Sequence, residues 1–127
     1  MTKARHAWLV IAALYELMRY DVTLRLRGFA GIHEQLRCHR VAPSQRYHAE
    51  AICDAVLFAA CFYWKPVLCL QRSVCEVRLL RRYGFFGRLA IGYRPAPFFS
   101  HAWTEIDGRA VNGGTAYQQR LQLLCRL

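Results

Sequence analysis

The chain has 127 residues, of which 55% are hydrophobic and 20% are charged. This composition excludes a disordered segment and fits a single globular domain of residues 1–127. Lys and Arg number 18 against 8 Asp and Glu, so the net charge is +10, which attracts anionic partners. The arginines are scattered and no nucleic-acid-binding signature is present, so an acidic peptide or protein partner is favoured over nucleic acid.

The six cysteines are expected to be free thiols in a reducing cytoplasm. The apolar run near the N-terminus covers only residues 7–15 and lacks a small-residue cleavage site. Neither a secretory signal peptide nor a membrane span is therefore expected. No CxxC pair occurs and no histidine lies at zinc-ligand spacing from a cysteine, so we expect no metal and no other cofactor.

Apolar residues recur at helical spacing near the start of the chain. From Ala7 to Leu26 they return every three or four positions, which predicts an amphipathic helix. Its core-facing side is expected to hold Trp8, Ile11, Ala12, Tyr15, Met18, Val22 and Leu26. Gly28 and Gly31 interrupt the pattern, and a second short helix is expected over residues 32–40.

A further helix is expected after the turn at Ser44, because this serine can accept a hydrogen bond from a free amide of the first turn. It should run to about Tyr63 and end before Pro66, since proline restricts the residue that precedes it. The stretch AEAICDAVLFAACFYW is apolar almost all round, which is typical of a helix in the centre of a domain.

The second part of the chain, residues 65–127, begins with a helix and continues with strands. The helix is expected from about Cys69 to Arg82, with apolar residues on one face and arginines on the other. The alternating stretches RLAIGYR and AWTEI predict two strands, and the Asp107-Gly108 turn should fold RAVN back as a third antiparallel strand. The order predicts an α+β fold, in which a helical part (residues 1–64) packs on a central helix and a small antiparallel sheet.

Cys69 and His101 are candidates for a nucleophile and its base. Unpaired amides and the dipole at the start of a helix stabilise a thiolate, and Cys69 is expected at such a start. A cysteine nucleophile also needs an imidazole that takes its proton and later delivers it to the leaving amine, which His101 could supply. The alternative is that both are packing or surface residues, because the sequence does not show whether they meet in space.

The segment CLQRSVCEVRLLRRYGFFGRLAIGYRPAPFFSHAWTEIDGRAVN, Cys69 to Asn112, resembles the core of the lasso-peptide leader peptidases. In that family of the transglutaminase-like superfamily, a CLxRS helix start precedes an LLRRxG helix end and an IGVxxxPFxAHAWVExxGxxxND sheet. The resemblance implies a transglutaminase-like or papain-like cysteine protease core. It also implies a Cys-His-Asp triad that removes the leader from a ribosomally synthesised lasso-peptide precursor.

By this resemblance Cys69 is the nucleophile and His101 is the base. The aspartate of the family follows an asparagine, but here Asn112 is followed by Gly113. Either Asn112, through its amide oxygen, or Asp107 is then expected to orient the imidazole. The position of Asp107 before a glycine also fits a plain turn residue, and a weakened or inactive homologue is a further alternative.

Several neighbouring residues have expected roles. Pro97 and Phe98 should shape the loop before the histidine and line the substrate groove, or else form a rigid connector. Trp103 is expected to pack beneath the site and to contact substrate, and Arg72 and Ser73 are expected to fix the helix against the sheet. Cys53, Cys61 and Cys125 are expected in the core, and Cys75, on another side of the helix from Cys69, is expected to be inert.

The resemblance also implies partners. These are the leader of the precursor peptide, a separate leader-recognition protein and an ATP-dependent lasso cyclase. Two other functions stay open. One is a transglutaminase-type acyl transferase, since its first half-reaction is the same. The other is a catalytically inactive binding scaffold in the same biosynthetic complex, because the aspartate of the family is missing and the chain is basic.

Overall fold

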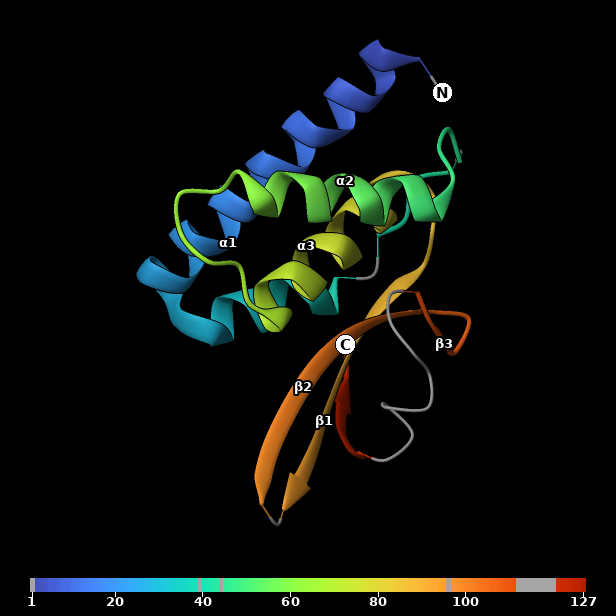
Figure 1. The fold of residues 1–127 in the computed structure, drawn as a ribbon. Coiled ribbons are helices and arrows are strands. Elements are labelled where there is room, and N and C mark those ends of the chain that lie inside the picture. The colour runs from blue at the N-terminus through green and yellow to red at the C-terminus, as the bar shows by residue number, and fades with distance from the viewer. Residues whose placement is uncertain (1, 39, 44, 96, 112–120) are drawn as a thin grey trace.

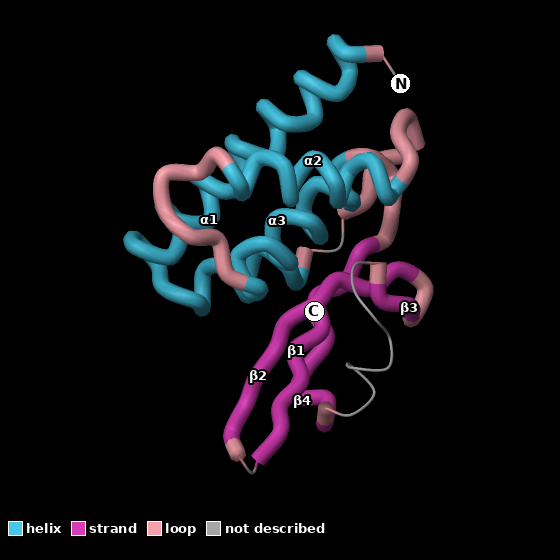
Figure 2. The backbone as a smooth tube through the Cα atoms, viewed as in Figure 1, coloured by secondary structure: helices cyan, strands magenta, loops and turns pink. Residues whose placement is uncertain are grey.

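The computed structural model describes residues 2–38, 40–43, 45–95, 97–111 and 121–127. Three helices precede the strands in this part of the chain, and the helices lie together on one side of the sheet (Figures 1 and 2). Their bounds are α1 Lys3–Arg37, α2 Ala49–Cys61, α3 Cys69–Arg82, β1 Gly87–Pro95, β2 Phe98–Ile106, β3 Arg109–Ala110 and β4 Gln122–Arg126. The predicted α+β fold is confirmed.

Helix α1 begins after Thr2, whose hydroxyl accepts a hydrogen bond from the amide of Arg5 at 3.3 Å. Gly28 has φ 68° and ψ −170°, a non-helical conformation inside the helix. Glycine takes such a positive φ without a steric penalty, so the predicted break at Gly28 is confirmed. Gly31 stays helical, and the helical path resumes as far as Arg37.

The face of α1 that packs on the other helices is not the predicted one. In the first six turns the buried residues are Leu9, Ala12, Ala13, Glu16, Leu17, Tyr20 and Thr23. Apart from Ala12, the residues of the predicted face are 54 to 77% exposed. The helix carries two apolar faces, and the small side chains of Ala12 and Ala13 allow its neighbours to pack closely against one of them.

Helix α2 differs from the prediction in its start and its environment. It begins at Ala49, after His48, which makes no side-chain cap bond; Ser44 lies outside the described residues. Its buried residues are Ile52, Cys53, Ala55, Val56 and Ala59, whereas Asp54 and Phe58 are exposed. The expectation of a centrally buried helix is therefore wrong for α2, which covers one side of the helical layer.

Helix α3 is the central helix, because it packs against α1, α2, β1 and β2. Its bounds agree with the prediction, and it ends before Gly84, which has φ 94°. The expected arginine face is partly wrong, since Arg81 is only 5% exposed. Its guanidinium donates to the carbonyls of Leu36 at 2.7 Å, Gly87 at 2.9 Å and Leu127 at 3.1 Å.

The strands form one antiparallel sheet in the order β3-β2-β1-β4. The predicted hairpin turn is confirmed, because Asp107 (φ 53°) and Gly108 (φ 77°) connect β2 to β3. The third strand is shorter than RAVN, and Asn112 lies outside the described residues. Strand β4 was not predicted; it pairs with β1 on the far side from β2.

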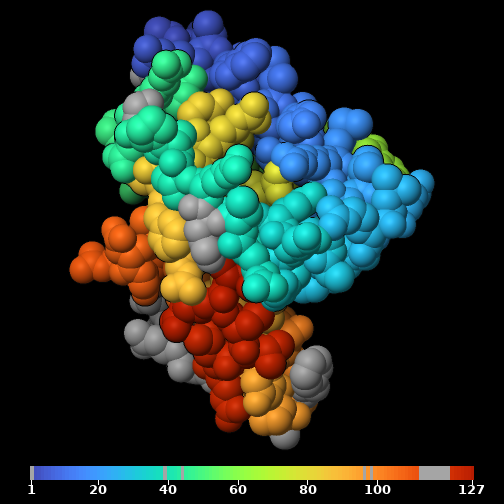
Figure 3. Space-filling view, turned by 180° about the vertical axis from the view of Figure 1, so that it is seen from behind, coloured from blue at the N-terminus to red at the C-terminus, as the bar shows by residue number. Residues whose placement is uncertain are grey.

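The C-terminal strand lies against the helical layer as well as the sheet. Leu127 and Leu89 exchange two backbone hydrogen bonds of 2.8 and 3.1 Å. In the view from behind, β4 (red) lies directly below the end of α1 (teal) (Figure 3), where Arg81 joins Leu36 to Leu127. None of the helices in the described ranges combines the length and apolar character needed to cross a bilayer.

Candidate active site

Helix α3 is fixed on β2 by two buried hydrogen bonds. The hydroxyl of Ser73 donates to the carbonyl of Ala102 at 3.2 Å, and the hydroxyl of Thr104 donates to the carbonyl of Ser73 at 3.3 Å. Buried polar groups of this kind are costly to leave unpaired, so the two bonds set the position of the helix along the strand. The expectation that Ser73 fixes the helix against the sheet is confirmed.

The contacts of Ser73 define how the start of α3 lies along β2. Helix and strand run in the same direction, because Leu80 lies beside Gly87, the partner of Ile106 at the end of β2. Cys69 precedes Ser73 by one helical turn, a rise of ~6 Å, which corresponds to about two residues of a strand. Ser73 contacts Ala102 and Thr104, so two residues back along β2 are positions 100 and 102, which flank His101. That Cys69 and His101 meet stays a prediction.

The first turn of α3 has no side-chain cap. Leu68 is the N-cap residue, has extended backbone angles and makes no side-chain hydrogen bond. Cys69 is the first helical residue, half-buried and a free thiol. The backbone amides of an uncapped first turn are free to donate hydrogen bonds to a negatively charged group at the start of the helix. The start of α3 can therefore stabilise a developing oxyanion next to the sulfur of Cys69.

His101 is half-buried on β2 and lies opposite Gly92 of β1. Its ring stacks on that of Trp103, with 6.0 Å between the ring centroids and an interplanar angle of 22°. Burial and the nearby positive charge of Arg72 both lower the pKa of the imidazole below its ordinary value. The ring is thus held neutral near neutral pH, the form that can accept a proton.

Trp103 is buried, with 5% of its surface exposed. Its indole Nε1 donates to Oε2 of Glu105 at 3.0 Å, and Oε1 of Glu105 accepts from Arg126 at 2.8 Å. A methyl group at Gly92 would lie 2.9 Å from the indole ring, so glycine is required there. Trp103 therefore lies where it supports the imidazole, and its expected contact with substrate stays a prediction.

Glu105 was missed by the sequence analysis. Burial alone would raise its pKa, but hydrogen bonds from Arg126 and Trp103 hold the pKa of this carboxyl below its usual value. The sequence pattern that could have identified Glu105 is the two-residue alternation of a strand, which places residues 101, 103 and 105 on one face of β2. The acidic residue of the HAWTE stretch therefore holds the tryptophan that lies against His101.

Asp107 and Asn112 were the two candidates for the residue that orients His101. Asp107 is exposed in the turn, six residues along β2 from His101, a path of ~20 Å in an extended strand. That separation is too great for a hydrogen bond, so the expectation that Asp107 orients His101 is not supported and its place is that of a turn residue. Asn112 lies outside the described residues, and its orienting role stays a prediction.

Pro97 and Phe98 lie where the hairpin turns from β1 into β2. Pro97 is exposed, and its carbonyl accepts a hydrogen bond from Nε of Arg94 at 3.3 Å. Phe98 is the first residue of β2 and pairs with Pro95. The turn precedes His101 on the same strand, and contact of either residue with a substrate stays a prediction.

A polar cluster that the sequence did not reveal holds the segment before Cys69. Asp21 of α1 accepts hydrogen bonds from Tyr63 and from Gln71 (3.2 Å), and forms an ion pair with Lys65 at 3.0 Å. Gln71 is buried and also donates to the carbonyl of Leu17 at 3.1 Å. The cluster ties the residues on both sides of Cys69 to α1. No local sequence pattern predicts it, because its members come from distant segments.

This cluster also shifts the acidity of its members. Burial and the bond to Asp21 raise the pKa of Tyr63 to about 12. Burial would raise the pKa of Asp21 too, but the bonds from Tyr63, Lys65 and Gln71 hold it below its usual value. Both shifts show that Asp21 is ionised and paired in the folded protein.

The other cysteines fall into three environments. Cys53 is fully buried, as predicted, and so is Cys75, which was expected only to be inert. Burial raises the pKa of both thiols, which makes them poor nucleophiles. Cys61 is exposed, so its expected place in the core is wrong, because it lies on the outer side of α2. Cys125 of the edge strand β4 is only half-buried.

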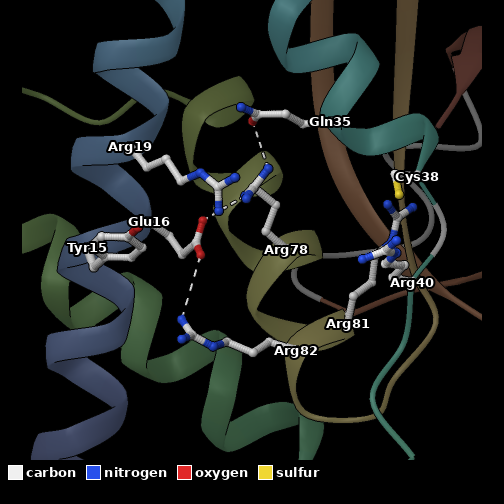
Figure 4. Close-up of a pocket in the computed structure, with 9 residues that line it drawn as sticks. All are labelled: Tyr15, Glu16, Arg19, Gln35, Cys38, Arg40, Arg78, Arg81 and Arg82. Atoms are coloured by element: carbon white, nitrogen blue, oxygen red, sulfur yellow. Dashed lines mark hydrogen bonds and ion pairs between the residues drawn. The ribbon is translucent and has the colours of Figure 1, made fainter.

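A pocket of about 470 Å³ lies away from Cys69, beside the second half of α3. Its lining residues are Tyr15, Glu16, Arg19, Gln35, Cys38, Arg40, Arg78, Arg81 and Arg82. Glu16 is buried and points between two arginines of α3, with Nε of Arg78 at 2.7 Å and a nitrogen of Arg82 at 4.0 Å (Figure 4). Its carboxylate is thus occupied within the fold.

The family model of the transglutaminase-like superfamily matches residues 16–126. The chain belongs to this superfamily. The match begins within α1 and includes α3 and the described strands, so it contains both Cys69 and His101. The superfamily implied by the motifs around these two residues is confirmed.

One curated protein to which this transglutaminase-like chain is similar is the Microcin J25-processing protein McjB of Escherichia coli. The two are 30% identical over 59 residues, which are 46% of this chain and 28% of McjB. The chain therefore spans less than a third of the length of that relative. No solved structure matches the chain significantly.

Proposed function

We propose that this transglutaminase-like protein is a cysteine peptidase that removes the leader from a ribosomally synthesised lasso-peptide precursor. Cys69 is the nucleophile and His101 is the base. The observation that carries the proposal is the free, half-buried Cys69 on the uncapped first turn of α3, a helix that Ser73 ties to β2 at Ala102, the residue after His101. The superfamily and the similarity to a protein that processes microcin J25 support the same chemistry.

The proposed reaction has two halves. His101 takes the proton of the Cys69 thiol, and the sulfur attacks the carbonyl carbon of the scissile amide. The amide of Cys69 donates to the oxyanion of the tetrahedral intermediate. The C–N bond then breaks, His101 gives its proton to the leaving amine, and a thioester stays on the enzyme. His101 next takes a proton from water, whose oxygen attacks the thioester carbonyl. The C–S bond then breaks, His101 returns its proton to the Cys69 sulfur, and the leader leaves with a free carboxylate.

The environment of His101 suits a base better than a preformed cation. Burial and the charge of Arg72 keep the imidazole neutral, so it is ready to accept the thiol proton when substrate is bound. Trp103 lies against the ring and is itself held by Glu105. We assign Trp103 and Glu105 as positioning residues, and Asn112 as the residue that orients the far nitrogen of His101.

The precursor is expected to reach this site on a partner. A separate leader-recognition protein that holds the leader would raise the effective concentration of the scissile bond. The basic surface of the chain, with its net charge of +10, would attract an acidic peptide or protein. Cleavage should be slow with the isolated chain and faster with that partner, and the product would pass to an ATP-dependent cyclase.

The test is incubation of the purified chain with the leader-recognition protein and candidate precursors from the same gene neighbourhood, followed by mass analysis. Cys69→Ala should leave the precursor intact. The matched control is Cys125→Ala, which removes another half-buried free thiol and should preserve cleavage. Full cleavage by Cys69→Ala would reject the assignment. A product whose mass is increased by that of an added amine would show acyl transfer. Absence of any product, together with alkylation of a cysteine other than Cys69, would favour a scaffold.

A further inference from the structure

Helix α1 carries an exposed apolar stripe that the fold does not use. It consists of six residues that are each 54 to 77% exposed, and we name it the α1 seam: Trp8, Ile11, Tyr15, Met18, Val22 and Leu26. The core-facing side of the same helix holds other residues, among them Leu9, Ala13 and Leu17, which are fully buried. The α1 seam is therefore additional to the hydrophobic core. In the view from behind, α1 (blue) is part of the molecular surface (Figure 3).

The spacing of the α1 seam is that of a helix–helix contact. From Trp8 to Val22 successive members are three, four, three and four residues apart, the pattern of the a and d positions in a coiled coil. At 3.6 residues per turn these five side chains lie within ~80° of the helix circumference. Such a stripe is narrow and straight, which fits a second helix better than the broad apolar face that enters a lipid surface.

The exposed area is large enough for a specific contact. Six side chains of this size at this exposure present on the order of 600 Å² of apolar surface, the upper end of what a monomer exposes. A standard protein interface buries about 800 Å² on each partner. The α1 seam and its polar margins therefore supply roughly one side of an ordinary interface.

Two hollows flank the α1 seam. One of about 240 Å³ lies beside Trp8, Ile11 and Tyr15, and Tyr83 forms part of its wall. The other, of about 550 Å³, lies beside Met18 and Val22. Its opposite wall is the segment before Cys69, which contributes Tyr63, Trp64 and Lys65. Hollows along a ridge accept the side chains of an opposing helix, as knobs enter holes.

The exposed charged side chains named beside the α1 seam are positive. Arg19, Arg25 and Arg82 are exposed next to it. The nearby carboxylates are already engaged: Glu16 is 3% exposed and pairs with Arg78, and Asp21 is bonded as described above. A second copy of the chain would bring the same arginines and a net charge of +10, so an acidic partner is favoured over self-association.

We propose that the α1 seam binds an amphipathic helix of a partner protein, whose apolar side chains enter the seam and its hollows and whose flanking Asp and Glu side chains pair with Arg19, Arg25 and Arg82. The bound helix would also contact Trp64 and Lys65, and so would lie against the segment that leads to Cys69. The binding surface is independent of the peptidase chemistry and can be tested without a cleavage assay.

The test uses two synthetic helical peptides of about 25 residues, both with leucines at the a and d positions. One has glutamates at the flanking positions and the other has lysines. Calorimetry or fluorescence should show binding of the glutamate peptide and at least ten-fold weaker binding of the lysine peptide. The double variant Arg19→Glu/Arg25→Glu should reverse this preference.

The variants test the location. Ile11→Glu/Met18→Glu should weaken binding of the glutamate peptide at least ten-fold with an unchanged circular dichroism spectrum, because both side chains are exposed. The matched control, Leu124→Glu, places the same charge at a 64% exposed apolar residue of β4 and should not change binding. Equal binding of both peptides, no binding, or loss with Leu124→Glu alone would overturn the proposal.

Two further measurements exclude other occupants. Sedimentation of the unmodified chain should show a monomer, and vesicles of phosphatidylcholine and phosphatidylglycerol should not bind it more tightly than the glutamate peptide does. A dimer that Ile11→Glu/Met18→Glu dissociates would assign the α1 seam to a second copy. Tight vesicle binding that the same variant abolishes would assign it to a membrane surface; either result replaces the partner helix.

Discussion

The imidazole of His101 stacks on the indole of Trp103, with ring centroids 6.0 Å apart and an angle of 22° between the planes. The indole in turn donates to the buried carboxylate of Glu105 at 3.0 Å. The orientation of the imidazole therefore depends on a residue that is itself fixed by a charge-assisted hydrogen bond. Changes at Trp103 should therefore act on His101.

Trp103→Phe should keep a ring beneath His101 but remove the donor to Glu105. We expect the free energy of unfolding to fall by ~1.5 to 3 kcal/mol, the range for a hydrogen bond to a charged group. Trp103→Leu should lower kcat further at similar KM, because it also removes the stacked ring. Urea unfolding and cleavage kinetics measure the two effects. In a Glu105→Gln background the loss caused by Trp103→Phe should be smaller; an unchanged loss would contradict the proposed coupling.

The pH dependence of cleavage should reflect the lowered pKa of His101. A base must be unprotonated, so the acid limb of kcat/KM should have its midpoint below the ordinary histidine value of about 6.5. Arg72→Gln should move this midpoint to higher pH, because a positive charge that disfavours the imidazolium is removed. Arg72→Lys keeps the charge and is the control. An acid limb that does not move in Arg72→Gln would show that Arg72 does not act on His101.

The same shift affects stability. His101 binds a proton less readily in the folded state than in the unfolded chain. Its contribution to the stability of the fold is therefore complete at pH values above about 6.5. That contribution is lost as the pH falls from 6.5 through the lowered folded pKa. His101→Gln should therefore show a smaller decline in melting temperature over this interval than the unmodified chain.

Gly92→Ala should disturb the support of His101 from the neighbouring strand. The added methyl group would lie 2.9 Å from the indole of Trp103 and from Cβ of Leu121. Overpacking of this kind costs about 1 to 3 kcal/mol, and the tilt of the indole should also lower kcat. Chemical denaturation gives the loss of stability. The double variant Gly92→Ala/Trp103→Leu should lose less than the sum of the two single changes, whereas simple additivity would show that the methyl group does not meet the ring.

Asp21→Asn should loosen the segment before Cys69. The variant removes the carboxylate that pairs with Lys65 and accepts from Tyr63 and Gln71. The pKa of Tyr63, about 12 in the folded protein, should fall toward the ordinary tyrosine value of about 10. Ultraviolet titration measures this shift, with Tyr63→Phe identifying the signal. If the titration of Asp21→Asn matched that of the unmodified chain, the carboxylate would not be the cause.

The stability of Asp21→Asn should also depend on pH differently from that of the unmodified chain. A carboxyl group with a lowered folded pKa stabilises the protein above its unfolded value of about 3.9, and this stabilisation disappears as the pH falls through the folded value. Asp21→Asn should be less stable than the unmodified chain at neutral pH. The difference between the two should narrow below about pH 3.9.

Local signals explain what the sequence could predict. The bounds of α3 follow from Pro66 before it and from Gly84, which takes φ 94° after it. The β2–β3 turn follows from the Asp107-Gly108 pair, because both residues adopt positive φ. The pairing of Cys69 with His101 stays a prediction that depends on the resemblance of the motifs to a known family, since no local pattern joins a helix start to a strand residue 32 positions away.

Features set by distant contacts could not be predicted. Helix α1 has two apolar faces, and only the positions of α2 and α3 decide which one is buried. Strand β4 lacks alternation because most of its residues are exposed at the edge of the sheet. Asp21 and Glu105 were not predicted to be site residues, because each is fixed by partners from other segments of the chain.

The buried guanidinium of Arg81 gives the protein an order of assembly. During synthesis Arg81 is made 46 residues before Leu127, whose carbonyl it binds. Until that residue emerges from the ribosome and docks, a positive charge in the middle of the helices lacks one of its three acceptors. The helical half can collapse early, but Arg81 gains its third acceptor only when β4 and Leu127 dock, so this buried charge is fully paired only after β4 has been translated.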